Sequence, residues 1–364
     1  MKGLKRQVSP GVAVLLVIIV LAIVQFVWWR GLVYRPPGPT PPRSGPPPPP
    51  PESHELIIKG LKDIQVDTLA GDLPPGDTDG PGYDARFDRP TGLAYDASTN
   101  ILYVCDSGNH RIRAISADGV VTTVSGGDQG YADGPAATAQ FCAPSAICLG
   151  AHPKELFVAD TGNGCIRRIR DGVVTTCIRA PELAKPCSIQ LAQGDGANKA
   201  AAETLVACDA VTHNMVTCHV GSTGNGSVTL LKLHSVSAVV SGAELGRPGG
   251  VTVPPLSITG KSDGDTPHPP LVKQISGWCA VGKAALITDP DHAGVFLQSD
   301  GVAQLIAGVV SSNRTIKDYR DGTGETATFS DLTGIATDNR HFAFVCDTES
   351  NCVRRLTLPD YLFH

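Results

Sequence analysis

The chain has 364 residues, a formal net charge of −5 and a pI near 6.0. This charge gives no overall attraction to polyanions, so the composition argues against nucleic-acid binding. Forty glycines, 29 prolines and only 5% aromatic residues favour many short strands joined by turns over long helices. Composition therefore predicts an all-β protein, and length alone leaves the number of domains open.

A short basic tail, residues 1–11, precedes an uncharged apolar stretch at residues 12–29. As a helix this stretch would be about 27 Å long at ~1.5 Å per residue, close to the thickness of the hydrocarbon core of a bilayer. A cleaved secretory signal is the competing interpretation. Because the stretch ends in Trp28, Trp29 and Arg30 rather than in small residues, we expect an uncleaved transmembrane signal-anchor in contact with the lipid bilayer.

The basic residues flanking this stretch predict its orientation. Three precede it and two follow it closely, which favours a cytoplasmic N-terminus and a luminal or extracellular remainder. The chain is then a single-pass type II protein of the secretory pathway or cell surface, and Asn225 and Asn313 become glycosylation candidates. The mitochondrial inner membrane is the alternative location.

A proline-rich linker, residues 30–53, follows the apolar stretch and contains a run of six prolines. Residues 36–51 predict an extended polyproline II spacer of about 50 Å, at ~3.1 Å per residue. The linker would hold residues 54–364 away from the bilayer.

Residues 54–364 contain an internal repeat. Residues 89–126 recur as residues 143–177, and each copy contains four apolar stretches separated by turns. Four antiparallel strands in a unit of about fifty residues predict one blade of a β-propeller. The second strand of each copy ends in an aspartate, and five copies are readable in this way: Asp106, Asp160, Asp209, Asp289 and Asp347.

The long interval before Asp289 predicts an insertion at residues 256–277 and leaves room for a sixth blade, with two strands taken from residues 226–242. The last copy lacks a fourth strand before the chain ends. Residues 64–71 resemble the fourth strand of the first copy, and no earlier strands precede them. We therefore expect residues 64–71 to complete the last blade, which would remove exposed sheet edges.

The first copy resembles the NHL repeat, whose pattern stands intact as Asp106-Ser-Gly-Asn109-His-Arg111-Ile112. The second copy keeps Asp160 and Asn163 but has a cysteine where the arginine is expected. The resemblance implies an NHL-type β-propeller. Propellers of this kind serve as interaction platforms, RNA binders and extracellular sensors, and related ones as metal-dependent lyases or hydrolases.

A second recurrence lies between blades. An Asp-Gly pair begins it three times, at Asp79, Asp133 and Asp321, and a phenylalanine follows eight residues after each aspartate. We expect Asp-Gly to form a tight turn and the phenylalanine to wedge between neighbouring blades. Direct ligand contact by these loops is the alternative.

The turns after the second strands and the loops between blades should share the face at the mouth of the central channel. This candidate binding face comprises Asp106, Asn109, His110, Asp160, Asn163, Asp209, His213, Asp289, His292 and Asp347. The alternative for the aspartates is structural, with each carboxylate accepting N–H groups of the following turn. The repeated arginines would brace blades or lie in solvent. His110, His213 and His292 could together hold a metal ion, although no cofactor is required.

Eleven cysteines suit an oxidising compartment and predict some disulfides. The plausible local pairs are Cys142–Cys148, Cys177–Cys187 and Cys208–Cys218. Cys105, Cys208 and Cys346 precede the repeat aspartate, which instead favours small buried residues.

No known catalytic motif is present, so the sequence favours a membrane-anchored module that binds a protein or glycan at the channel face. The alternatives are a metal-dependent lyase or hydrolase of the propeller type, and an assembly or scaffold protein of the mitochondrial inner membrane.

Overall fold

The computed structural model describes residues 63–192, 203–211, 215–220, 226–231, 276–282, 284–299, 302–309 and 319–363. The tail, apolar stretch and linker predicted at residues 1–53 lie outside these ranges, as do Asn225, Asn313, His213 and most of the insertion at 256–277. None of the helices within these ranges is long and apolar enough to span a bilayer. The described helices are short 3₁₀ turns: η2 (Gly82–Asp84), η3 (Thr161–Asn163) and η4 (Asp360–Phe363).

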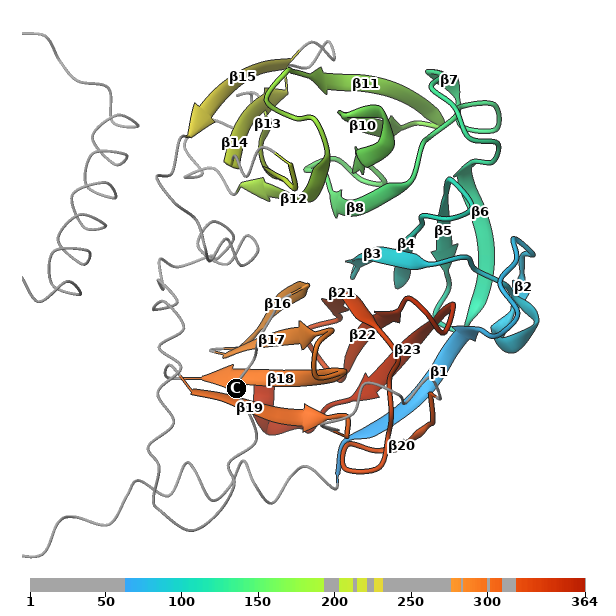
Figure 1. Ribbon diagram of the computed structural model, residues 1–364, viewed down its shortest axis with the longest axis vertical. Helices are drawn as coiled ribbons and strands as arrows, with labels where there is room; N and C mark the ends of the chain where they lie inside the picture. The colour runs from blue at the N-terminus through green and yellow to red at the C-terminus, as the bar shows by residue number, and fades with distance from the viewer. Residues whose placement is uncertain are drawn as a thin grey trace, which may run out of the picture. The chain divides into compact units, whose positions relative to one another are not determined.

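The described strands form five antiparallel sheets, the blades of a β-propeller (Figure 1). Blade 1 contains β3 (Pro90–Asp96), β4 (Ile101–Asp106), β5 (Arg111–Ile115) and β6 (Val120–Gly126). Blade 2 contains β8 (Pro144–Leu149), β9 (Leu156–Asp160), β10 (Cys165–Arg170) and β11 (Val173–Arg179). Blade 3 contains β12 (Pro186–Ala192), β13 (Glu203–Asp209), β14 (Met215–Val220) and β15 (Gly226–Leu231). Blade 4 contains β16 (Gly277–Val281), β17 (Ala284–Asp289), β18 (Gly294–Ser299) and β19 (Val302–Ala307).

Blade 5 joins the two ends of the domain. It contains β21 (Leu332–Thr337), β22 (Phe342–Asp347), β23 (Cys352–Thr357) and, from the other end, β1 (Gln65–Gly71). Strand β1 pairs antiparallel with β23, with Val66 opposite Leu356 and Asp67 opposite Arg355, and the blue and red ribbons meet there in Figure 1. The predicted completion of the last blade by residues 64–71 is confirmed.

The second strand of each blade is buried along nearly its whole length, and in blades 1, 2 and 5 described sheets pack on both of its faces. Apolar runs such as ILYVCD in β4 and FAFVCD in β22 satisfy that requirement, and β-branched residues suit the pleated surface. All five predicted aspartates are the last residues of these second strands.

The first strands of neighbouring blades contact one another, β3 with β8 and β21, β8 with β12, and β16 with β21. The first strands therefore lie at the centre and the fourth strands at the outside. Apolar clusters fill the spaces between blades, and Phe87 lies with Val104 of blade 1 and with Phe344 and Val353 of blade 5. Phe141 and Phe329 occupy the matching places between blades 1 and 2 and between blades 4 and 5. The predicted phenylalanine wedge is confirmed.

The Asp-Gly pairs do not form tight turns, contrary to the expectation. The glycine and the residue after it form two-residue strands, β2 (Gly80–Pro81), β7 (Gly134–Pro135) and β20 (Gly322–Thr323). These strands pair with β6, β11 and β1, so they add a fifth strand to the outer edge of blades 1, 2 and 5. The Asp-Gly motifs therefore lie at the periphery of the blades and not at the channel mouth.

The structure corrects the prediction that residues 226–242 supply two strands of a sixth blade. Strand β15 pairs with β14 along its whole length, from Met215 opposite Leu231 to Val220 opposite Gly226. Residues 226–231 are thus the fourth strand of blade 3, and residues 232–242 lie outside the described ranges.

All eleven cysteines are free thiols, so the three predicted disulfides are not formed. Cys218 lies opposite Leu205 in the β13–β14 ladder, three positions from Cys208, and an odd separation directs side chains to opposite faces. Cys177 and Cys187 belong to different blades. Cys142 instead accepts a hydrogen bond from the Gln129 amide at 3.0 Å. Cys105, Cys208 and Cys346 are buried, as predicted.

Candidate functional site: the channel mouth and the frame behind it

A buried aspartate–arginine pair recurs in blades 1, 2 and 5. The second-strand aspartate accepts a hydrogen bond from the guanidinium seven residues later, at 2.7 Å in Asp106–Arg113, 2.8 Å in Asp160–Arg167 and 3.4 Å in Asp347–Arg354. All six side chains have no exposed surface. Because an unpaired buried charge is costly, each partner requires the other.

The aspartate of the Asp-Gly motif binds the other side of the same guanidinium. Nη2 donates to Asp79 Oδ1 at 2.6 Å in blade 1, and to Asp133 and Asp321 at 2.7 Å in blades 2 and 5. Each guanidinium also lies over the wedge phenylalanine, 5.0 to 5.1 Å from the ring centroid. One arginine per blade therefore ties together the outer strand, the wedge and the end of the second strand.

Burial raises the pKa of Asp106 to about 6, although hydrogen bonds from Asn109, the Asp88 N–H and Arg113 oppose this effect. Burial also raises the pKa values of Asp160 and Asp347, again against hydrogen bonds and the nearby arginine. Burial is the largest cause in all three blades, and in each an arginine and backbone N–H groups oppose it.

The predicted asparagines and His110 complete this frame. Asn109 Nδ2 donates to Asp106 Oδ2 at 2.8 Å, and Asn163 Nδ2 donates to Asp160 Oδ2 at the same distance. His110 Nδ1 accepts the N–H of Ala143, in the loop that leads into blade 2, at 3.0 Å. Asn351 holds the matching position in blade 5, where its Oδ1 accepts the Arg89 N–H at 2.8 Å. His110 and Asn351 thereby connect one blade to the next.

The aspartates of blades 3 and 4 have different partners. Asp209 accepts the N–H groups of Lys185 and, at 3.0 Å, of Val211. Asp289 Oδ1 accepts the Asp291 N–H at 2.9 Å, and its Oδ2 lies 2.6 Å from His292 Nδ1. The interpretation that these aspartates accept N–H groups of the following turn fits blade 4 and, in part, blade 3, where Asp209 also accepts an N–H from the loop before the first strand. The aspartates of blades 1, 2 and 5 accept N–H groups of that loop.

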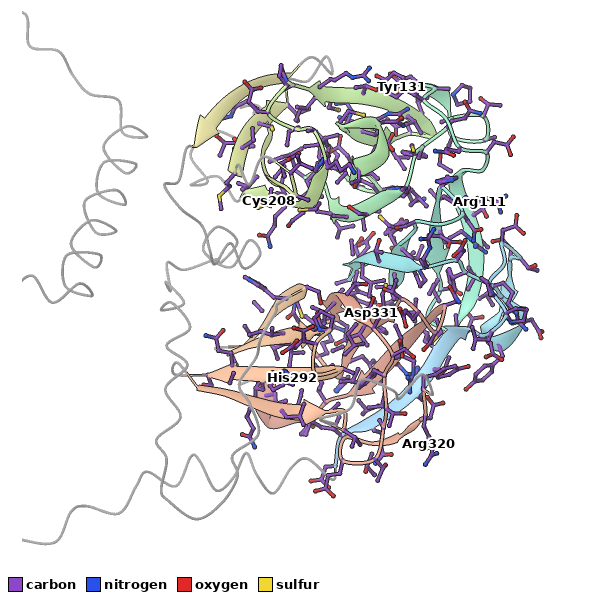
Figure 2. All side chains as sticks on the ribbon, in the orientation of Figure 1. Arg111, Tyr131, Cys208, His292, Arg320 and Asp331 are labelled. Carbon is purple, nitrogen blue, oxygen red and sulfur yellow. The ribbon has the colours of Figure 1, made fainter. Side chains whose placement is uncertain are left out.

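Two of the three predicted metal-binding histidines have other partners in the described structure. His110 bonds to Ala143, and His292 is buried beside Asp289 within blade 4 (Figure 2). His213 lies outside the described residues. Within the ranges that the structure describes, no three His, Cys, Asp or Glu side chains are grouped so as to hold a metal ion.

A belt of hydroxyl groups surrounds the inner ends of blades 1, 2 and 5. The residue after each second-strand aspartate bonds to a hydroxyl at the start of the first strand, with 2.6 Å between Thr91 and Ser107 and the same between Ser145 and Thr161. It also donates to the first proline of the next blade, as Ser107 does to Pro144. Blade 5 repeats the arrangement with Thr333 and Thr348. Hydroxyl groups thus line the inner ends of these three blades.

The predicted binding face therefore has two layers. The five aspartates and His292 are buried, whereas Asn109, His110 and Asn163 are partly exposed. Sequence reasoning did not single out Arg113 or the hydroxyl belt. The constant spacing of seven residues from the aspartate to the arginine was the available signal for Arg113.

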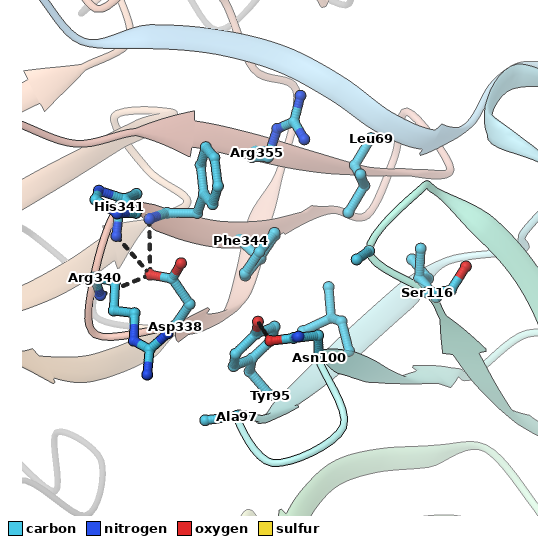
Figure 3. Close-up of a pocket in the computed structure, with 14 residues that line it drawn as sticks. Leu69, Tyr95, Ala97, Asn100, Ser116, Asp338, Arg340, His341, Phe344 and Arg355 are labelled. Atoms are coloured by element: carbon cyan, nitrogen blue, oxygen red, sulfur yellow. Dashed lines mark hydrogen bonds between the residues drawn. The ribbon is translucent and has the colours of Figure 1, made fainter.

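A separate pocket of about 260 Å³ lies at the junction of blades 1 and 5, as Figure 3 shows. Its lining comes from the β3–β4, β5–β6 and β21–β22 loops and from β1 and β23. Because successive turns of an antiparallel sheet emerge at opposite ends, this pocket is at the end of the propeller away from the hydroxyl belt.

Residues 87–115 match the family model of the NHL repeat. The chain is 38% identical over 126 residues to NHL repeat-containing protein 2 of Bos taurus and 37% identical to the human protein, matches that cover 32% of this chain and 17% of each relative. Over 96 residues it is 35% identical to the chloroplastic protein SUPPRESSOR OF QUENCHING 1 of Arabidopsis thaliana, covering 26% of this chain and 9% of that protein. The chain thus spans less than a fifth of the length of these relatives.

Among solved structures, a gluconolactonase from Xanthomonas campestris aligns with a TM-score of 0.43 at 12% identity, covering 83% of this chain and 92% of that one. An auxiliary nutrient binding protein from Bacteroides ovatus aligns with a TM-score of 0.44 at 14% identity, covering 81% and 76%. The matched repeat coincides with blade 1, where β4, the Asp106 turn and β5 lie. The chain thus contains a segment that matches the NHL repeat, within a β-propeller of five described blades.

Proposed function

We propose that this chain is a binding module that recognises a protein or glycan at the channel mouth, without catalysis. We further propose that residues 12–29 anchor it in a membrane, with the propeller on the luminal or extracellular side.

One observation carries the first proposal: the strand-end aspartates behind the mouth are bound to arginines inside the protein. Asp106, Asp160 and Asp347 are fully buried and paired with arginines, so the mouth presents hydroxyls and turn backbone instead. Hydroxyls and turn backbone on a rigid scaffold offer hydrogen-bonding groups that suit a polar partner such as a glycan or a peptide backbone. Loops held on a rigid scaffold are common recognition surfaces.

Site-specific photo-crosslinking tests the proposed face. A benzophenone amino acid at Glu349, exposed in the β22–β23 turn, should give an adduct in cells that express the full chain naturally. The same group at Asp171, whose side chain is 87% exposed in the β10–β11 turn at the opposite end, should not. Adducts from Asp171 alone, or from neither position, would reject the channel mouth as the binding face.

Enzymatic deglycosylation tests the proposed topology. A chain routed through the secretory pathway should shift in mobility after treatment with an endoglycosidase, and the shift should disappear in the Asn225→Gln, Asn313→Gln double variant. Recovery of an unshifted chain in mitochondrial membranes would support the alternative location instead.

A further inference from the structure

We propose that the pocket between blades 1 and 5 binds a small organic acid, made of a compact apolar body and one carboxylate. This site lies at the end of the propeller opposite the hydroxyl belt and does not depend on the proposed channel-mouth function.

The inner part of the pocket is apolar and rigid. Leu102, Ile115 and Phe344 are at most 6% exposed, and Tyr95 stacks on Phe344 with 5.4 Å between ring centroids. Phe342 adds a third ring, 6.3 Å from Phe344. These walls exclude water from an apolar ligand without requiring any rearrangement of the site.

The polar groups at the rim are mainly hydrogen-bond donors. The one carboxylate there is Asp338, whose Oδ1 already accepts the N–H groups of Arg340, His341 and Phe342 at 2.8 to 2.9 Å. Asn100 accepts a hydrogen bond from Tyr95 through Oδ1, which directs its amide NH₂ elsewhere. The rim thus offers donors to a ligand rather than acceptors.

The cations at the rim differ in what they already bind. Arg355 is paired with Asp67 at 2.7 Å and lies over the Phe342 ring, and His341 lies 3.3 Å from Asp360. Arg340 is exposed, and its guanidinium has no hydrogen bond or ion pair with another described residue. Its planar fork matches a carboxylate in two parallel hydrogen bonds.

The volume limits the size of the ligand. A pocket of about 260 Å³ lies just below the range of roughly 300–1,000 Å³ typical of drug-sized ligands. One ring with a short acidic side chain fits this volume and places the carboxylate at the rim while the ring lies against the aromatic wall.

The test uses 3-phenylpropanoate and its uncharged amide with the purified full-length chain, measured by saturation-transfer NMR. We expect the acid to bind about tenfold more tightly than the amide, as for one charge-assisted hydrogen-bonded pair. Arg340→Gln should weaken binding of the acid about tenfold and leave that of the amide unchanged. Ala117→Trp, at an exposed residue of the lining, should abolish binding of both.

Two matched controls lie away from the pocket. Arg89→Gln removes an arginine whose side chain is 68% exposed, and Ala137→Trp places an equally large ring on an exposed loop of blade 2. Neither should alter the affinity. Equal affinity for acid and amide, equal effects of the control substitutions, or absence of binding by the acid at millimolar concentration would each overturn the proposal.

Discussion

Replacing Arg167 by methionine should destabilise the propeller far more than the same change at its neighbour Arg168. Arg167 is fully buried and donates to Asp160, Asp133 and the carbonyl groups of Gln140 and Ala132. Arg168 is partly exposed on the other face of β10, and its Nε has no hydrogen-bond partner. The two variants differ by one position in one strand, so intrinsic strand propensity is matched.

The magnitude follows from what each change leaves behind. Without Arg167, the carboxylate of Asp160 stays buried with only the Asn163 amide and the Cys142 N–H as donors. Breaking a buried ion pair by removing one partner costs about 3–5 kcal/mol. Methionine retains the apolar contact with the Phe141 ring, so little of this cost comes from lost packing. Arg168→Met should change the free energy of unfolding by less than about 1 kcal/mol.

Urea unfolding of the full-length chain, followed by far-ultraviolet circular dichroism, measures both variants from the shift in midpoint multiplied by the slope m. A second change separates charge from geometry. If the cost comes from the stranded carboxylate, adding Asp160→Leu to Arg167→Met should recover most of the lost stability. Similar losses for the two single variants, or a double variant less stable than Arg167→Met, would refute the reasoning.

Three further predictions follow from the same structure. The pKa of Asp106 is raised from 3.8 to about 6, so the folded state holds this proton to a higher pH than the unfolded state and stability falls as the pH rises from about 4 to 6. Relative to Asp106→Asn, the wild type should lose on the order of 2–3 kcal/mol of unfolding free energy across this window, at about 1.4 kcal/mol per pKa unit. A stability difference between the two proteins that does not change with pH in urea titrations would contradict the raised pKa. Gly126 has φ +91°, and a Cβ added there would lie 2.3 Å from the His110 carbonyl oxygen, whereas a Cβ added at Gly127 would meet no atom within 4 Å. Gly126→Ala should therefore lower stability by more than about 1 kcal/mol and Gly127→Ala by much less. Equal melting temperatures of the two variants would argue against this backbone geometry. Alkylation of the denatured, unreduced chain should add eleven carbamidomethyl groups by mass, and fewer would reveal a disulfide.

The positions of the strand-end aspartates could be predicted from the sequence, but their burial could not. The sequence singles out the aspartates because they end second strands. In the structure, three of them are buried and paired with Arg113, Arg167 and Arg354. Whether a strand-end carboxylate faces solvent or a guanidinium depends on the neighbouring blade and its wedge phenylalanine, which lie outside the local pattern. The prediction of a turn at Asp-Gly was wrong for a similar reason, since two of the motifs pair with a strand about forty residues later and the third pairs with β1 at the start of the domain.

The disulfide predictions were wrong because proximity along the chain does not set the direction of side chains. Cys208 and Cys218 occupy adjacent strands, yet their register places them three positions apart and on opposite faces. Pairing requires close Cα atoms and converging Cβ directions, and both are properties of the folded ladder.

By itself the sequence determined the repeat, the four-stranded blade, the aspartate at the end of each second strand and the closure through residues 64–71. These features follow from local periodicity and from the similarity of one segment to another. Only the tertiary structure decided which guanidinium meets which carboxylate, which hydroxyls line the channel mouth, and that Tyr95 and Phe344 form one pocket wall. Asp106 and Arg113 are close in the sequence, but only the folded strands show that their side chains meet. Tyr95 and Phe344 meet because ring closure brings the first and last blades together.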